Sequence, residues 1–355
     1  MNKKIYSIQI LRGIAAILVV YAHSIDMAEW LQKESWQGSF KYLQNFGAIG
    51  VDLFFVISGF VMVYVTQNVF GYKEAKKFFV KRIIRIYSLY LPLILLLILY
   101  KHPGLLITIK DLTLLPVTDT GNVFLPITIQ VAWTLSFEMF FYLLMAIAIH
   151  LSRGQHVMMT GITLFILTIF GANGHFSEVH LTFLTNPILL EFLFGLIIGW
   201  IYIKKFKIPV MAILFLLLIS GMTFIILVIN GYGNISEAGF TLDASSSVTR
   251  VILWGIPSAM FVAGLVFLES TYSPVSVNFL RNNMLNLLGN ASYSIYLVHT
   301  ILFSAILSTG FPRFSGINGD VLIFIFITLA CFVGIFVHLF LEKLLLKYST
   351  SKILN

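Results

Sequence analysis

The residues best suited to chemistry in this chain are ionisable side chains that stand inside long apolar segments. They are Arg12, His23, Asp52, Glu138, Glu191, His299 and His338. An ionisable group inside a membrane span costs free energy, so such groups are rare there and are usually functional. Together they offer cations, carboxylates and imidazoles. These are the groups that bind an anionic substrate and move a proton.

Arg12 and His23 are the most informative pair because they lie eleven residues apart in one apolar segment. Eleven residues of α-helix turn through about 1100°, some 20° from three full turns, so both side chains share one face, about 16 Å apart along the axis. Arg12 suits an anion, and His23, kept neutral by burial, can accept a proton. The alternative is that Arg12 extends to the lipid headgroups and His23 lies at the outer interface.

Two carboxylates are candidates for orienting that histidine. Asp52 lies in the segment 50–60, where it can orient an imidazole or bind a hydroxyl. It can equally be a first-turn carboxylate that the helix dipole favours. Glu138 lies one turn before Tyr142, so the two side chains can meet on a face that we expect to point into the bundle. We take His23, Asp52 and Glu138 as the candidate catalytic residues.

Arg82 and Arg85 end a basic segment, 73–85, that precedes the third apolar stretch. They lie three residues apart and share a helical face. Guanidinium groups bind phosphates through two parallel hydrogen bonds, so with Arg12 they form a candidate site for a phosphate-bearing acyl donor. The alternative is a cluster of cytoplasmic basic residues that binds lipid.

The remaining ionisable residues have less definite roles. His299 lies at a depth similar to that of His23, so it can share the same site or simply bond to a neighbouring carbonyl group. Glu191 has no chemical role that the sequence defines, and we expect it to bond between helices. His338 lies close to Glu342 and is expected to be structural.

The elements that carry these residues are predicted to be membrane-spanning helices. Of the 355 residues, 59% are hydrophobic and 11% are charged, and the mean hydropathy is +0.94. A soluble domain has about 25% charged residues. A span needs about 20 mainly apolar residues, and ten segments qualify: 8–25, 47–66, 83–100, 131–150, 157–171, 183–203, 208–229, 249–268, 287–308 and 321–341. We expect an all-α helix bundle that forms one transmembrane domain over residues 1–355, without a fused soluble domain.

The distribution of basic residues predicts the orientation. With the N-terminus inside, 16 of the 23 Lys and Arg residues face the cytoplasm and Arg12 lies within the first helix. The six outside are Lys33, Lys41, Lys101, Lys110, Arg250 and Arg313. This asymmetry places both termini in the cytoplasm and residues 26–46 outside. It also explains the net charge of +8 through lipid headgroups, without a nucleic-acid partner. The single cysteine, Cys331, excludes an intrachain disulfide and a multi-cysteine metal site, and no metal site is expected.

Five blocks of the sequence resemble the membrane acyltransferase 3 family. They are Ser7–His23 with its Arg–His pair, Gly50–Phe60, the Arg-x-x-Arg of Arg82 and Arg85, Trp133–Tyr142, and Gly289–His299. They occur in the family's order and extend over nearly the whole chain, and the opening block is most similar to exopolysaccharide acetyltransferases. The family's third-helix motif usually continues to a proline close to Ile86, whereas here the next proline is Pro92.

The resemblance implies an integral enzyme of the bacterial inner membrane. Such enzymes move an acetyl group from acetyl-CoA to a carbohydrate hydroxyl, here of an exopolysaccharide, a lipopolysaccharide or another lipid-linked glycan, with no tightly bound cofactor. Two alternatives stay open. One is a transporter or flippase that moves a glycan-lipid or an anion without chemistry, although the inverted repeats that many transporters show are absent. The other is the same enzyme with succinyl in place of acetyl.

Overall fold

The computed structural model describes residues 4–40, 43–101, 108, 111–115, 128–174, 176, 178–230, 244–271, 282–308 and 316–353, which are mostly helical and contain no strand. Within these residues ten helical stretches are long and apolar enough to cross a membrane. Each overlaps one of the ten predicted segments, so the predicted all-α membrane architecture is confirmed. Of the basic residues used for the orientation, Lys3, Lys41, Lys110, Arg281 and Arg313 lie outside the described residues.

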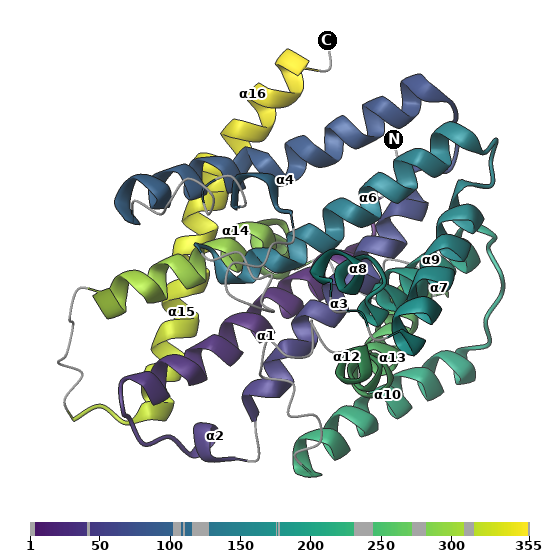
Figure 1. The fold of residues 1–355 in the computed structure, drawn as a ribbon. Helices are drawn as coiled ribbons and strands as arrows, with labels where there is room; N and C mark the ends of the chain where they lie inside the picture. The colour runs from purple at the N-terminus through teal and green to yellow at the C-terminus, as the bar shows by residue number, and fades with distance from the viewer. Residues whose placement is uncertain are drawn as a thin grey trace. The chain divides into compact units, whose positions relative to one another are not determined.

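The longer helices carry most of the candidate residues (Figure 1). They are α1 (Tyr6–Trp30), α3 (Leu43–Val65), α4 (Tyr72–Lys101), α6 (Trp133–Leu151), α7 (His156–Asn173), α9 (Leu190–Ile203), α10 (Val210–Asn230), α13 (Ile256–Thr271), α14 (Asn283–Ser308) and α15 (Gly319–Val337). The shorter ones are α2 (Trp36–Ser39), α8 (Val179–Leu184), α12 (Ala244–Arg250) and α16 (Lys343–Ile353), with 3-10 turns η1 (Gln130–Ala132) and η2 (Pro187–Leu189) and π-helical turns η3 (Val251–Gly255) and η5 (His338–Glu342).

Three of the predicted boundaries differ clearly from the observed ones. α1 continues to Trp30 rather than ending near 25, and α4 begins at Tyr72 rather than 83. The last span continues through η5 to Ser349 rather than ending near 341. Hydropathy marks where a helix leaves apolar surroundings, whereas Lys, Arg and Glu are good helix formers and let the backbone helix continue into polar surroundings. The basic segment therefore forms the first turns of α4 and does not precede it.

The helices group into two compact units, which are described separately. The first unit comprises Met1–Ile57, Lys204–Glu237 and Thr249–His338, and the second comprises Ser58–Ile203, Ala238–Val248 and Leu339–Asn355. Among the candidate residues, Arg12, His23, Asp52 and His299 belong to the first unit. Arg82, Arg85, Glu138 and Glu191 belong to the second. That residues 1–355 form one domain stays a prediction.

In the first unit, α1 lies against α13, α14 and α15, and Figure 1 shows it beside α15. Glycine allows the closest approaches. A Cβ atom on Gly289 of α14 would come within 2.0 Å of the Gln9 carbonyl oxygen, and one on Gly50 of α3 within 2.2 Å of the Ala15 carbonyl oxygen. Neither position can hold a larger side chain without moving a backbone, as is common where membrane helices pack closely. The helix that carries Arg12 and His23 is therefore held tightly on two sides.

In the second unit, α6 packs against α4 and α7, and the span 179–203 is broken. The break lies at Asn186 and Pro187, where the Asn186 side chain accepts hydrogen bonds from Ile188 N at 3.0 Å and Ser247 Oγ at 2.8 Å. Side-chain partners of this kind satisfy the backbone where a membrane helix is interrupted. Glu191 follows in the first turn of α9, fully buried. A helix N-terminus stabilises negative charge, and this explains why a carboxylate is tolerated in the buried first turn of α9. The sequence alone did not suggest this explanation.

Candidate functional site

His23 lies in the C-terminal part of α1 and is oriented by a carboxylate one turn further on. Its Nδ1 atom lies 3.2 Å from Oδ2 of Asp26. A carboxylate only accepts hydrogen bonds, so Nδ1 carries the hydrogen and Nε2 is the nitrogen that can take up or release a proton. The His23 side chain keeps 36% of its exposure, more than the burial expected from the sequence. The arrangement presents a partly exposed imidazole whose Nδ1 is held by a carboxylate.

His299 of α14 contacts the same imidazole. The two rings stack with their centroids 5.3 Å apart and their planes at 27°. His299 is fully buried, and its Nδ1 lies 3.1 Å from the Ile295 carbonyl oxygen. The expectation that His299 shares the depth of His23 is therefore confirmed. The alternative of a histidine bonded to a neighbouring carbonyl holds at the same time.

A network of hydrogen bonds holds the segment that follows α1. The Asp320 carboxylate accepts hydrogen bonds from Ser35 Oγ at 2.8 Å, Gln37 N at 3.1 Å and Trp36 N at 3.2 Å, so it caps the short helix α2. Tyr21, two residues before His23, donates from its hydroxyl to Gln37 Oε1 at 2.9 Å. These bonds tie the end of α1 to the start of α15 and limit the movement of the turn that carries His23.

Arg12 lies eleven residues before His23 on the same uninterrupted helix and is partly buried. The helix is continuous from Tyr6 to Trp30, so the spacing that places the two side chains on one face stands. The Glu269 carboxylate accepts hydrogen bonds from Tyr6 N and Ser7 N, at 2.9 and 2.7 Å, which anchors the first turn of this helix. The role of Arg12 in donor binding stays a prediction.

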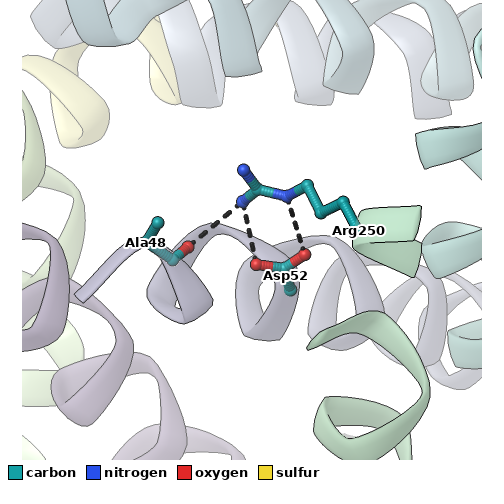
Figure 2. A network of polar contacts seen from close by, with 3 residues as sticks. All are labelled: Ala48, Asp52 and Arg250. Carbon is teal, nitrogen blue, oxygen red and sulfur yellow. Dashed lines mark hydrogen bonds and ion pairs between the residues drawn. The ribbon is translucent and has the colours of Figure 1, made fainter. Parts of the chain in front are cut away.

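Asp52 has a partner that the sequence did not indicate. Its two carboxylate oxygens accept hydrogen bonds from Arg250 Nε at 3.0 Å and Nη2 at 2.8 Å, and Nη2 also donates to the Ala48 carbonyl oxygen at 3.2 Å (Figure 2). Both side chains are 1% exposed. Arg250 lies near the start of the span Ser246–Thr271 and is buried against Asp52, and its assignment to the outer side stays a prediction. In this geometry Asp52 binds a guanidinium group, whereas Asp26 orients the His23 imidazole.

The local backbone explains why Arg250 lies inside the unit. Arg250 ends α12, and the next five residues form the π-helical turn η3 before α13 begins. Pro257, the second residue of α13, has no N–H group that could donate a hydrogen bond within the helix. A π-helical turn before the proline is one way in which the backbone adjusts to this missing bond. Ser220 Oγ donates to the Pro257 carbonyl oxygen at 2.9 Å and fixes α13 against α10.

In the second unit, Arg82 lies among aromatic and acidic groups. Its guanidinium carbon lies 5.7 Å from the centre of the Phe78 ring and 5.9 Å from that of Tyr142. Glu138 is close enough to interact electrostatically with Arg82 and with Tyr142. The Tyr142 hydroxyl lies 3.3 Å from Ser58 Oγ. Arg82, Glu138 and Tyr142 thus come together as the sequence spacing indicated for Glu138 and Tyr142.

Arg85 is bound to a buried carboxylate from the end of the chain. Its Nη1 donates to Oε1 of Glu342, whose side chain is fully buried. Glu342 is the last residue of the π-helical turn η5, and α16 beyond it packs against α4 (Figure 1). The two arginines of the Arg-x-x-Arg motif therefore have different surroundings. The Nε atom of Arg82 is buried without a hydrogen-bond partner among the described residues, whereas Arg85 forms an ion pair.

Sequence reasoning missed Asp26, and it missed the pairing of Arg250 and Glu342 with candidate residues. Asp26 had a usable signal, because a residue three positions after His23 faces it on a helix. It was overlooked because the apolar segment ends at residue 25 while the helix does not. Arg250 is 198 positions from Asp52, and Glu342 is 257 positions from Arg85. No spacing rule connects residues so far apart.

Comparisons with known proteins identify a family and a relative for this chain. The family model Acyl_transf_3, described as an acyltransferase domain, matches residues 5–340. The chain is similar to the exopolysaccharide production protein ExoZ of Rhizobium meliloti (strain 1021), with 28% identity over 316 residues that cover 86% of this chain and 92% of the relative. No solved structure matches it.

Proposed function

The chain belongs to the acyltransferase 3 family, and from this premise we propose that it moves an acetyl group from cytoplasmic acetyl-CoA to a hydroxyl of an exopolysaccharide or another lipid-linked glycan. The observation that carries the proposal is the His23 imidazole, whose Nδ1–H is tied to Asp26 so that Nε2 is free to act as a base. The similarity to a protein of exopolysaccharide production supports a polysaccharide as the acceptor.

In the proposed reaction His23 is the general base. Its Nε2 takes the proton of the acceptor hydroxyl while the hydroxyl oxygen attacks the thioester carbonyl. The new C–O bond forms, the C–S bond breaks, and the CoA thiolate leaves and takes back the proton. Asp26 holds the ring in the required tautomer and stabilises the imidazolium that forms. Such base catalysis contributes about 10²–10⁴-fold to the rate.

The donor is proposed to bind through Arg82 and Arg85, with Arg12 as a further cation. The buried Nε of Arg82 has no hydrogen-bond partner among the described residues, which supports this assignment, because a buried donor without an acceptor is costly unless a ligand satisfies it. Arg85 is held by Glu342, which positions its guanidinium group but also competes for it. We therefore expect Arg82 to contribute more than Arg85 to binding the CoA phosphates.

Replacing both Arg82 and Arg85 with Lys is expected to raise the dissociation constant for acetyl-CoA about tenfold or more. Lys keeps the charge and the membrane orientation but loses the two-pronged hydrogen bonding. A charge-assisted contact is worth about 1.5–3 kcal/mol, and about 1.4 kcal/mol is a factor of ten. Calorimetry on purified protein measures this constant, and Arg82→Lys alone separates its share from that of the Glu342 pair.

The matched control removes positive charge from the same helix, α4, without changing Arg82 or Arg85. Lys76 and Lys77 are exposed near the start of α4, so Lys76→Ala with Lys77→Ala is expected to leave the constant unchanged. If the arginines only anchor lipid, the double-Lys variant binds acetyl-CoA normally, and that result would remove them from the donor site.

The proposed location is the bacterial inner membrane, with both termini in the cytoplasm. This orientation is supported by the excess of Lys and Arg in the segments assigned to that side. The proposed partners are acetyl-CoA, the glycan acceptor and membrane lipids.

The function is tested by incubating the purified protein with acetyl-CoA and a polysaccharide extract, followed by mass spectrometry of the glycan. We expect the mass of one acetyl group per modified residue and equimolar release of free CoA thiol. Succinyl-CoA in a parallel reaction shows whether the acyl group is selected. A protein that moves glycan-lipid across vesicles while acetyl-CoA stays intact would be a transporter, and the proposal would be wrong.

A further inference from the structure

His299 is a buried titratable residue to which the reaction above gives no role. It is fully buried on the face of α14 that packs against α1. Of the neighbours of α14, α1 makes the most extensive contact with it. Besides the stacked His23 ring, it meets the Tyr296 ring at 6.1 Å and the edge of the Phe303 ring at 5.8 Å between centroids. A fully buried group is expensive to charge because it is removed from water. The ring therefore stays neutral.

The tautomer of His299 follows from the hydrogen bond that its Nδ1 makes. The Ile295 carbonyl oxygen, 3.1 Å from Nδ1, can only accept, so Nδ1 carries the hydrogen. Nε2 then holds a lone pair, which is buried and has no hydrogen-bond partner among the described residues. The hydrogen bond to the backbone of its own helix fixes the orientation of the ring. What this fixed ring presents to His23 is its aromatic face, as the stacked geometry requires.

We propose that His299 is a positioning residue for His23, and that its neutral ring face stabilises the imidazolium that His23 becomes when it accepts the proton. This inference rests on the proposed function and adds a residue to it. An aromatic face attracts a cation, and the attraction is stronger away from water. As the proposed general base, His23 gains its positive charge only when it takes the proton, so the stabilisation grows as charge develops in the transition state. Asp26 supports the same cation from the His23 Nδ1 side.

This role is distinguishable from simple filling of the core. A packing role changes the stability of the protein, but it does not change the turnover of the molecules that stay folded. A role through the charged form of His23 lowers kcat and leaves KM for acetyl-CoA unchanged, because the interaction is made in the transition state. Removing an aromatic face from a cation costs about 2-fold at an exposed site and about 30-fold at a desolvated one, and the partly exposed His23 lies between these limits.

The experiment compares His299→Leu, which fills the space without an aromatic face, with His299→Phe, which keeps one. For each we measure kcat per folded molecule, KM for acetyl-CoA and the midpoint of thermal unfolding. We expect His299→Leu to lose about 2- to 30-fold in kcat at constant KM, and His299→Phe to stay within about twofold of the wild type. The Phe variant also tests the idea if the Leu variant does not fold, because a severe loss of kcat in folded His299→Phe protein would overturn it.

Phe303→Leu is the matched control, since Phe303 belongs to the hydrophobic core beside His299 and its ring contacts the His299 ring. It is expected to lower the unfolding midpoint while kcat stays unchanged. Equal kcat in the wild type and in both His299 variants would reduce His299 to a packing residue. Absence of acetyl transfer by the wild-type protein is a different result, because it would overturn the proposed function itself.

Discussion

His23→Ala is expected to lower acetyl transfer by about 10²-fold or more while the protein still folds and inserts. The substitution removes the one base that the α1 site holds with its Nδ1 tied to a carboxylate and its Nε2 available. Few packing contacts are lost, because the His23 side chain is 36% exposed. The assay is the incorporation of acetyl groups into glycan at saturating acetyl-CoA, with the unfolding midpoint measured on the same preparation.

Two companion variants make this result specific. His180 is exposed on α8, so His180→Ala loses an imidazole of no proposed function and should transfer acetyl groups normally. Asp26→Asn keeps the shape of the side chain but offers an amide in place of the carboxylate, so it should lower kcat less than His23→Ala does.

Near-normal acetylation by His23→Ala would contradict the role of general base. Glu138→Gln in the same assay tests whether Glu138 assists, which stays a prediction.

The second large effect is expected on stability, from breaking the buried ion pair of Asp52 and Arg250. Arg250→Ala leaves the Asp52 carboxylate buried without its counter-charge, and such a change costs about 3–5 kcal/mol. The bidentate geometry in Figure 2 makes this pair the main polar link between α3 and the end of α12 in the first unit. The unfolding midpoint in detergent should therefore fall sharply.

A double-mutant cycle separates the pair from the single side chains. Asp52→Asn combined with Arg250→Gln removes both charges and keeps polar groups, so it should be more stable than either single charge-removing variant. Arg153 is exposed, and Arg153→Ala should change stability by no more than about 0.5 kcal/mol. If Arg250→Ala matches this control, the ion pair does not stabilise the fold.

The two predictions also separate roles that the sequence assigned together. His23 and Asp52 were both candidate catalytic residues. The contacts place Asp26 on the imidazole and Arg250 on Asp52. We therefore expect Asp52→Asn to act mainly through stability, with a normal kcat for the molecules that remain folded. A loss of kcat without a loss of stability would return Asp52 to the catalytic group.

The ten spans and the Arg12–His23 pair were predictable from the order of residues alone. A membrane span depends on the summed apolarity of about 20 consecutive residues, and the face shared by two side chains depends only on their spacing in a helix. The five motif blocks indicated the family for the same reason, since each is a short local pattern. Helix ends were less accurate because the helical backbone of α1 and α4 continues past the apolar stretch.

The partners of the charged residues depended on tertiary structure. His299 reaches His23 from 276 positions away, and Arg250 reaches Asp52 only because glycine contacts bring α3 against α1 while a π-helical turn follows Arg250. A carboxylate inside a membrane must find a counter-charge or a donor, but several are available to each one, and the local sequence does not rank them. The choice is made by which helix faces pack together, and packing is a property of surfaces that the chain assembles from distant segments.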